Sequence, residues 1–264
     1  MRRPSPLFLA EYGSRATGTA HEGSDHDLLG PYIPSREALY GLDDAPSGTF
    51  RIHRDGSITH VSSNAARAEG TDVEVKLYPL RKFASRAADG DLNTLSTLWA
   101  TRDLLAHDRA EGIMLREGRE LFLSRRAVRR SLEYARSQQV ALTGAHRGRS
   151  TRAELVEKYG YDTKYAVHMI RALLTGLDLA REHTFHLPMR PEHIDILSEI
   201  RDGLWPLSDI LTYADTLEHQ LIDDMEQSRL PEAVDHDAIN RLLIDVTETY
   251  LADPGGERFF PTPA

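Results

Sequence analysis

Two aspartates two residues apart, Asp25 and Asp27, are the side chains of this sequence best placed to do chemistry together. They begin the segment 25–32, whose apolar residues and closing Pro31 predict a strand. Because residues i and i+2 of a strand share a face, both carboxylates project from one side. Two carboxylates held that close repel each other unless a cation lies between them. Such hard oxygen ligands suit Mg²⁺, which is bound together with waters and substrate phosphates.

The turn Gly13-Ser14, at the end of a predicted buried strand over 7–11, could hold phosphate oxygens. Glycine permits a close backbone approach, and serine adds a hydroxyl donor. The guanidinium of Arg15, directly after this turn, is placed to bind phosphate as well.

A third carboxylate on a neighbouring strand would complete a site for two divalent ions, Mg²⁺ or Mn²⁺. The segment 72–78 alternates apolar and polar residues, which predicts a strand with Asp72 and Glu74 on its polar face. Either acid is placed to supply the third ligand. Two metals about 4 Å apart stabilise the attacking and leaving oxygens of an in-line displacement at phosphorus.

The spacing of Gly-Ser and Asp-x-Asp, with ten residues between them, resembles the signature of the DNA polymerase β nucleotidyltransferase superfamily. His26 departs from that pattern, which usually has an apolar or aromatic residue there, and we interpret it as a packing substitution on the opposite face. Residues 72–83 and 155–174 resemble two blocks of the RNA-ligase-associated, polymerase β-like subfamily. Together with the N-terminal motif, these blocks span residues 15–175.

The resemblance implies an α+β fold: a small mixed sheet with flanking helices, followed by a mostly α-helical domain. It favours Glu74 over Asp72 as the third ligand, because the family's acid stands five residues before a Ser-Leu pair, here Pro79-Leu80. It implies transfer of a nucleoside monophosphate from an NTP to an acceptor hydroxyl, with release of pyrophosphate. By analogy the acceptor is a nucleic-acid end, such as RNA under repair. The alternatives are transfer to a small molecule or a protein side chain, and a non-catalytic nucleotide-binding protein.

A predicted helix over 162–182 carries an apolar stripe and, roughly opposite, a polar stripe that includes Lys164, His168 and Arg171. A solvated basic face is the ordinary interpretation of such a stripe. The resemblance to the family block favours contacts of Lys164 and His168 with the nucleotide triphosphate.

These elements imply a catalytic core over residues 1–105 and a helical domain over 106–264. Strands are predicted before residue 79, including a hairpin with strands over 49–53 and 58–61 around Asp55-Gly56. The spacing of apolar residues then becomes helical. Predicted helices cover 80–88, 108–122, 125–142, 152–158, 162–182, 192–201, 207–227 and 235–252.

Charge is spread unevenly over a chain of 264 residues with a net charge of −9. Residues 116–152 hold ten Arg and three acids, whereas residues 192–264 hold seventeen acids and four Arg. The basic segment is either a solvated helix face or a surface for the phosphates of an RNA or DNA acceptor. The absence of cysteine excludes disulfides and thiolate zinc sites, and no long apolar run predicts a membrane span. We therefore expect a cytoplasmic protein.

Overall fold

The computed structural model describes residues 5–21, 23–43, 45, 48–52, 58–61, 73–144 and 152–253. The chain forms two compact units. The first comprises Met1–Phe122 and Val234–Ala264, and the second comprises Leu123–Ala233.

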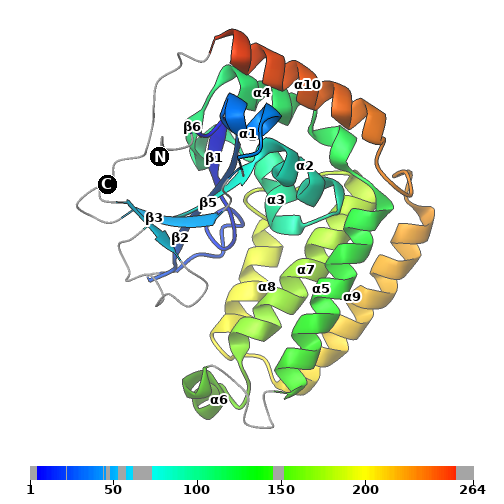
Figure 1. Ribbon diagram of the computed structural model, residues 1–264. Helices are drawn as coiled ribbons and strands as arrows, with labels where there is room; N and C mark the ends of the chain where they lie inside the picture. Colours follow the sequence, from blue (N-terminus) through cyan, green and yellow to red (C-terminus); the bar gives the residue numbers. More distant parts are fainter. Residues whose placement is uncertain are drawn as a thin grey trace. The chain divides into compact units, whose positions relative to one another are not determined.

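The first unit contains a mixed sheet of six strands, counted over its described residues, in the order β4-β3-β5-β2-β1-β6 (Figure 1). β2 and β5 run parallel, and every other neighbouring pair is antiparallel. The strands are β1 (Phe8–Glu11), β2 (His26–Tyr32), β3 (Gly48–Ile52), β4 (Ile58–Val61), β5 (Val73–Pro79) and β6 (Leu105–Asp108). A mixed sheet followed by a mostly helical region confirms the predicted α+β class.

Alternation along β5 separates the two faces of this sheet. Val73, Val75 and Leu77 are buried, whereas Glu74, Lys76 and Tyr78 between them are half-buried. The buried residues join a hydrophobic cluster from neighbouring strands, which contains Leu9, Leu28 and Tyr32. This cluster fixes which side chains of β2 and β5 face the other way.

Helix α2 (Leu80–Ala88) follows β5 and buries its apolar side. Its Phe83 packs edge-to-face against Phe8 of β1, with the ring centroids 5.8 Å apart. The other helices of this unit are α1 (Arg36–Tyr40), α3 (Leu92–Ser96), α4 (Ala110–Glu117), α10 (His236–Ala252) and the short 3₁₀ turns η1 (Thr97–Trp99), η2 (Arg102–Leu104) and η3 (Arg119–Phe122).

The C-terminal helix α10 packs against α4 and α2, far from it in sequence. Gly118 permits a close approach, because a Cβ there would lie 2.5 Å from Leu242 Cδ2. The compact unit around the sheet therefore includes α4 and α10, whereas the sequence placed a boundary near residue 105. That functional division, with a catalytic core over 1–105, stays a prediction.

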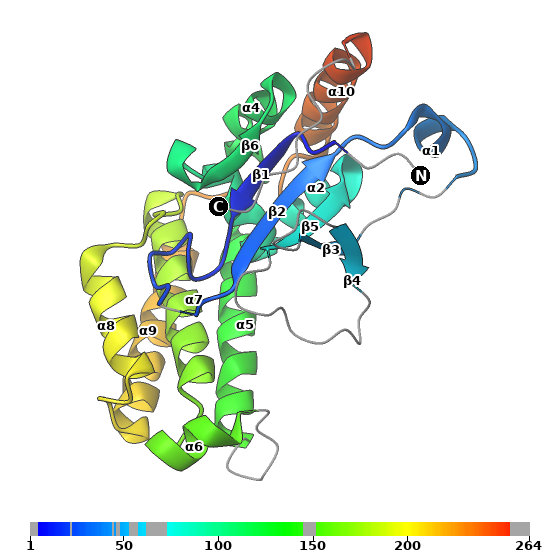
Figure 2. The same cartoon turned by 90° about the vertical axis from the view of Figure 1, so that its left-hand side faces the viewer.

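The second unit is built around α7 (Thr163–Glu182), which packs against three other helices (Figures 1 and 2). These neighbours are α5 (Arg125–Gly144), α8 (Pro191–Arg201) and α9 (Leu207–Gln227), and the short α6 (Ala153–Tyr159) precedes α7. Gly176 permits the close packing, since a Cβ there would lie 2.1 Å from Ser131 Oγ on α5. The predicted apolar stripe of α7, which includes Ala166, Ile170 and Leu173, is buried.

None of the helices described is long and apolar enough to cross a membrane.

Candidate functional site

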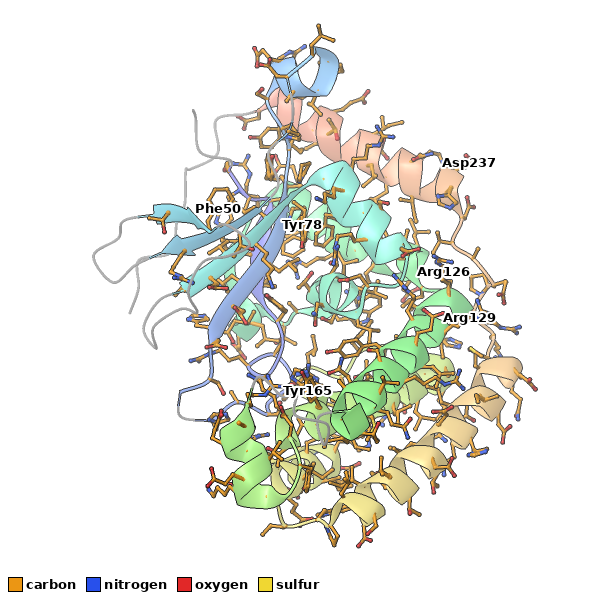
Figure 3. All side chains as sticks on the ribbon, turned by 60° about the horizontal axis from the view of Figure 1, so that its bottom comes forward. Phe50, Tyr78, Arg126, Arg129, Tyr165 and Asp237 are labelled. Carbon is orange, nitrogen blue, oxygen red and sulfur yellow. The ribbon has the colours of Figure 1, made fainter. Side chains whose placement is uncertain are left out.

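The register of three neighbouring strands places Asp27, Glu74 and Arg51 in one row across the sheet. Asp27 of β2 is the Cα partner of Glu74 in the parallel β2–β5 pair, and Glu74 is the partner of Arg51 in the antiparallel β5–β3 pair. Side chains at paired positions share a face. Figure 3 shows the strands of this row with Tyr78 labelled, two positions beyond Lys76 on the same side of β5.

Asp25 comes directly before β2, half-buried like Asp27. Burial raises the pKa of the Asp27 carboxyl, and the like charges of Asp25 and Glu74 raise it further. The positive charges of Lys76 and His26 oppose this shift. The three predicted carboxylates are therefore near enough to interact electrostatically, and burial keeps the pKa of Asp27 raised although the charge of Lys76 opposes the shift.

Lys76 supplies a cation on the same face as Glu74. Its Nζ donates a hydrogen bond of 2.5 Å to Tyr12 Oη and lies 5.0 Å from the centroid of the Tyr12 ring. The backbone N–H of Tyr12 donates to the carbonyl of Asp27 at 3.3 Å. Burial and the nearby charge of Asp27 raise the pKa of Tyr12, so its hydroxyl stays protonated. Sequence reasoning did not single out Tyr12 or Lys76, although alternation along β5 already placed Lys76 with Glu74.

Arg51 is the second cation of this row that sequence reasoning did not single out. Its Nη2 lies 2.7 Å from Glu74 Oε1, and the two side chains are only 13% and 23% exposed. The positive charge of Arg51 therefore holds Glu74 in position on the sheet. Arg51 lies on β3, which pairs with β5 but is distant from Glu74 in the sequence. No local sequence pattern around Glu74 therefore predicts this contact.

The turn after β1 brings the predicted phosphate-binding residues close to Asp25. Gly13 has φ +71°, a left-handed conformation that glycine adopts without strain. The carbonyls of Gly13 and Ser14 accept hydrogen bonds from the N–H groups of Thr17 and Thr19, at 3.1 and 2.8 Å. Arg15 Nε donates to the carbonyl of Asp25 at 3.3 Å. The turn and the start of β2 are therefore joined through Arg15.

His26 lies on the opposite face of β2 from Asp27. Its Nε2 is 2.9 Å from Glu11 Oε1, and this hydrogen bond holds the pKa of Glu11 below its usual range. This contact agrees with the interpretation of His26 as a packing residue on the face away from Asp27.

The donor set of Asp25, Asp27 and Glu74 fits divalent ions that prefer oxygen, such as Mg²⁺ or Mn²⁺. Burial and the charges of Asp25 and Glu74 raise the pKa of Asp27, and a cation there would favour its ionised form. The oxygens of the three side chains do not all lie within 4.8 Å of one another, and Glu74 is engaged by Arg51. Binding would therefore draw the carboxylates together. Asp72, the alternative third ligand, lies outside the described residues.

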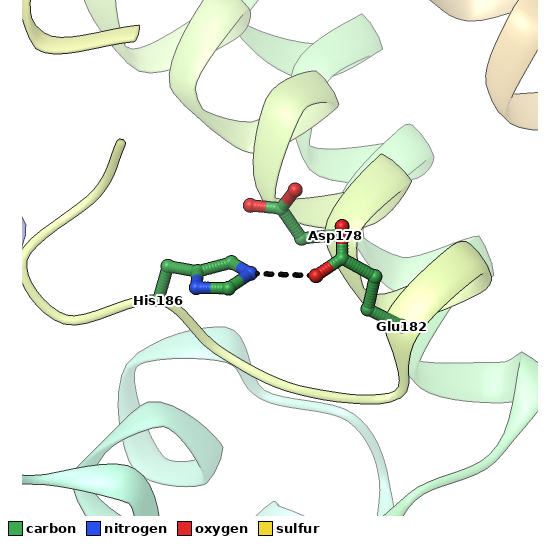
Figure 4. Close-up of side chains that lie close together, drawn as sticks. All are labelled: Asp178, Glu182 and His186. Carbon is green, nitrogen blue, oxygen red and sulfur yellow. Dashed lines mark hydrogen bonds and ion pairs between the residues drawn. The ribbon is translucent and has the colours of Figure 1, made fainter. Parts of the chain in front are cut away.

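A tighter group occurs in the second unit, where Asp178, Glu182 and His186 bring one ligand atom each within 4.8 Å of one another (Figure 4). Arg190 already supplies a cation to this group. Its Nη1 lies 2.5 Å from Asp178 Oδ1, and its Nη2 contacts Glu182 and lies 2.9 Å from His186 Nε2. The arrangement is an ion-pair network that joins the end of α7 to the start of α8.

Lys164 and His168 both lie on α7, in the second unit. The buried carboxylate of Asp162 begins this helix by accepting a hydrogen bond of 3.0 Å from the Lys164 N–H. Burial lowers the pKa of His168 to about 3, with further lowering by the positive charges of Arg171, Lys164 and Arg152. His168 is therefore neutral at physiological pH. The predicted contacts of Lys164 and His168 with a nucleotide stay predictions.

Several arginines of the basic segment 116–152 are paired within the second unit. Arg129 Nη2 lies 2.7 Å from Glu232 Oε1, and Arg136 Nη2 lies 2.5 Å from Glu218 Oε1. Figure 3 labels Arg126 and Arg129 on α5. Part of this charge thus stabilises the fold through ion pairs. Arg147 and Arg149 lie outside the described residues.

Comparison with known families identifies the class of protein that this sheet and its carboxylates define. The model of a family described as RlaP, the RNA repair pathway DNA polymerase beta family, matches residues 5–245, and the chain belongs to that family. No curated protein matches the chain. Family membership implies nucleotidyltransferase activity in RNA repair with an NTP substrate, and members of the polymerase β superfamily typically use divalent metals.

Proposed function

We propose that this protein transfers a nucleoside monophosphate from an NTP to a hydroxyl at an RNA end and releases pyrophosphate. The observation that carries the proposal is the pairing of Asp27 with Glu74 on adjacent parallel strands, with Asp25 close enough to raise the pKa of Asp27. Three carboxylates near enough to interact, joined to the Gly13-Ser14 turn through Arg15, suit metal-dependent phosphoryl transfer.

Asp25 and Asp27 hold both ions in this proposal, and Glu74 serves the ion on the acceptor side. When bound, two Mg²⁺ or Mn²⁺ ions would neutralise charge on the attacking and leaving oxygens. Glu74 orients the acceptor hydroxyl and accepts its proton. Arg51, whose Nη2 lies 2.7 Å from Glu74 Oε1, holds that carboxylate in position on the sheet.

The residues Gly13, Ser14 and Arg15 bind the β- and γ-phosphates of the NTP. The left-handed Gly13 opens the turn, and the link from Arg15 to the carbonyl of Asp25 places this turn beside the carboxylates. Lys164 and His168 are further contacts to the nucleotide, Lys164 as a charge and neutral His168 as a hydrogen-bonding partner.

The acceptor assignment rests on the family and on the basic segment 116–152. Because Arg129 and Arg136 are paired with acids, Arg147, Arg149 and Arg152 are the more plausible contacts to RNA phosphates. Arg152 is itself 2.9 Å from buried Asp162, so we assign the main contribution to the other two.

The test is incubation with each labelled NTP and Mg²⁺ or Mn²⁺, offered with RNA, DNA, protein and small-molecule acceptors. We expect label on RNA ends, lost in EDTA and in Asp27→Asn but retained in the exposed control Asp103→Asn. Label on another acceptor would overturn the RNA assignment. Binding of NTP without turnover on any acceptor would indicate a nucleotide-binding protein instead.

A further inference from the structure

Lys76 is a half-buried cation on the sheet face that carries Glu74. It lies two positions after Glu74 on β5, and alternation along the strand puts both side chains on one face. Its Nζ donates a hydrogen bond of 2.5 Å to Tyr12 Oη. Among the described residues, no carboxylate forms an ion pair with Lys76, whereas the cation Arg51 is paired with Glu74. An ammonium group has three N–H donors, so two of those on Lys76 have no acceptor within the described part of the chain.

Tyr12 adds a hydroxyl donor at the same place. It is only 6% exposed, and its Oη accepts the hydrogen bond from Lys76. A phenol that accepts a hydrogen bond still has its own O–H to donate, and none of the described residues accepts it. Buried polar groups are as a rule hydrogen-bonded, so donors that lack an acceptor indicate a place for a ligand. A positive charge with free N–H and O–H donors suits an oxyanion.

This pair adjoins both parts of the proposed active site. Tyr12 directly precedes the turn Gly13-Ser14, which we assign to the β- and γ-phosphates. The backbone N–H of Tyr12 donates to the carbonyl of Asp27 at 3.3 Å, and Asp27 is the register partner of Glu74. In an NTP the α-phosphate joins the β-phosphate to the nucleoside, and its phosphorus is the atom that the acceptor attacks. A phosphate chain that runs from the turn to the carboxylates therefore brings the α-phosphate to the face that carries Lys76.

We propose that Lys76, held in place by Tyr12, binds a non-bridging oxygen of the α-phosphate of the NTP. The identity of this ligand rests on the proposed function, and the inference adds two residues to which the family resemblance assigned no role. In the reaction the acceptor oxygen bonds to the α-phosphorus and gives its proton to Glu74. The bond from this phosphorus to the β-phosphate oxygen breaks, and its electron pair leaves with pyrophosphate. The charge of Lys76 stabilises the negative non-bridging oxygen throughout.

Isothermal titration with an α,β-methylene analogue of ATP and Mg²⁺ measures the contact without turnover. We expect Lys76→Met to weaken binding about tenfold or more, the effect of one lost charged hydrogen bond. Lys76→Arg keeps the charge and should restore most of the affinity. The matched control is Lys82→Met, an exposed lysine on α2, which should bind like the unaltered protein. Equal binding by Lys76→Met and the unaltered protein, or no binding by the unaltered protein, would overturn the proposal.

Tyr12→Phe tests whether Tyr12 acts through Lys76. Both changes affect the same contact, so the double variant should lose less affinity than the sum of the two single losses. Strictly additive losses would overturn the positioning role of Tyr12. Melting temperatures separate binding from folding, because the upward shift that the analogue produces should shrink in Lys76→Met. A lower melting temperature without ligand, together with an unchanged shift, would assign Lys76 to the fold alone and overturn the proposal.

Sulfur in place of one α-phosphate oxygen tests the contact during the reaction. For one of the two diastereomers, the rate loss caused by sulfur should be smaller in Lys76→Met than in the unaltered protein, because the variant has no contact to lose. Equal losses in both proteins, for both diastereomers, would overturn the contact. Analogue binding that depends on Lys76, in a protein that labels no acceptor, would refute the proposed function and leave the nucleotide contact standing. Labelling of RNA by Lys76→Met at the unaltered rate would do the reverse.

Discussion

Burial and nearby negative charges disfavour ionisation of the Asp27 carboxyl. Burial and the charges of Asp25 and Glu74 raise its pKa, and Lys76 compensates only in part. A carboxyl with a raised pKa binds its proton more tightly in the folded than in the unfolded state. The free energy of unfolding is therefore reduced once the pH rises above the ordinary pKa of aspartate, about 3.9.

Asp27→Asn should abolish turnover, by a factor on the order of a hundred or more, because a ligand for both ions is lost. In EDTA at pH 7 its melting temperature should equal or exceed that of the unaltered protein. The difference should vanish near pH 3, where aspartate is protonated in both states. Turnover assays and calorimetric scans at the two pH values check this. Retained activity would contradict the metal assignment, and a lower melting temperature at pH 7 would contradict the argument from the raised pKa of Asp27.

Glu74→Gln should reduce the turnover rate by roughly a hundredfold to ten-thousandfold, the range for a lost general base. NTP affinity should change little, because Glu74 is assigned to the acceptor side. Single-turnover rates and NTP titrations separate the two effects. Asp72→Asn is the matched control and should be mild. If Asp72→Asn is the damaging change, the third ligand is Asp72 and the assignment to Glu74 is wrong.

The lowered pKa of His168 predicts how the free energy of unfolding depends on pH. Its pKa of about 3 in the folded protein lies below the ordinary value of 6.5, so the unfolded chain binds the proton more tightly. Stability should therefore be full above pH 6.5 and fall as the pH drops towards 3, with each pKa unit worth about 1.4 kcal/mol.

Denaturant unfolding of His168→Gln at pH 7 and pH 4.5 measures this contribution against the unaltered protein. The variant should lose less stability on acidification, because glutamine does not titrate. His219→Gln is the control, since His219 is exposed and the hydrogen bond with Asp215 raises its pKa instead. If stability depends on pH identically in His168→Gln and in the unaltered protein, the lowered pKa of His168 is contradicted.

At the scale of elements, β2 must lie close to β1 to hold Asp27 in register. Gly30 makes this possible, because a Cβ there would lie 1.9 Å from the carbonyl oxygen of Phe8. Gly30→Ala should destabilise the protein by about 3 kcal/mol, as for overpacked sites, and reduce turnover by displacing β2. Gly144→Ala, where a Cβ meets nothing within 4 Å, should leave both unchanged or raise stability slightly. Urea titrations compare the two, and equal stability would contradict the register argument.

Long elements with strong periodicity were predicted well from the sequence. The predicted helix over 207–227 has the bounds of α9, and those over 80–88 and 162–182 match α2 and α7 within one residue. The short elements α1, α3 and β6 were missed. β6 has only four residues, and its antiparallel pairing with β1, ninety-seven residues earlier in the chain, decides its conformation. Local propensity carries little information about a strand that short.

At the scale of the whole molecule, the contrast between a net charge of −9 and the basic segment 116–152 bears on the acceptor. Arg147→Gln with Arg149→Gln should raise the KM for RNA and reduce the salt dependence of binding by about one unit of slope per lost phosphate contact. NTP affinity should not change. Arg102→Gln, an exposed arginine outside the segment, is the control.

RNA titrations at several salt concentrations, with melting temperatures of the same variants, check this prediction. Arg129→Gln should change stability little, because its pair with Glu232 is exposed. RNA affinity that is absent or insensitive to salt throughout would remove the nucleic acid acceptor and favour a small-molecule or protein acceptor.

The sequence by itself determined the residue types and their local faces. Gly13-Ser14 and Asp25-x-Asp27 predicted metal-dependent phosphoryl transfer, because spacing along one strand sets which side chains share a face. The family resemblance, now shown by the match over residues 5–245, supplied the fold class.

Only the tertiary structure decided what surrounds those residues. Parallel pairing of β2 with β5 places Asp27 next to Glu74. Antiparallel pairing of β3 with β5 places Arg51 where it forms an ion pair with Glu74. Packing of α7 against α5 placed His168 Nδ1 3.3 Å from Tyr134 Oη. Such neighbours depend on strand register and helix packing between distant segments. The periodicity of one segment predicts which of its own residues are buried. It does not predict which residues of another segment pack against them.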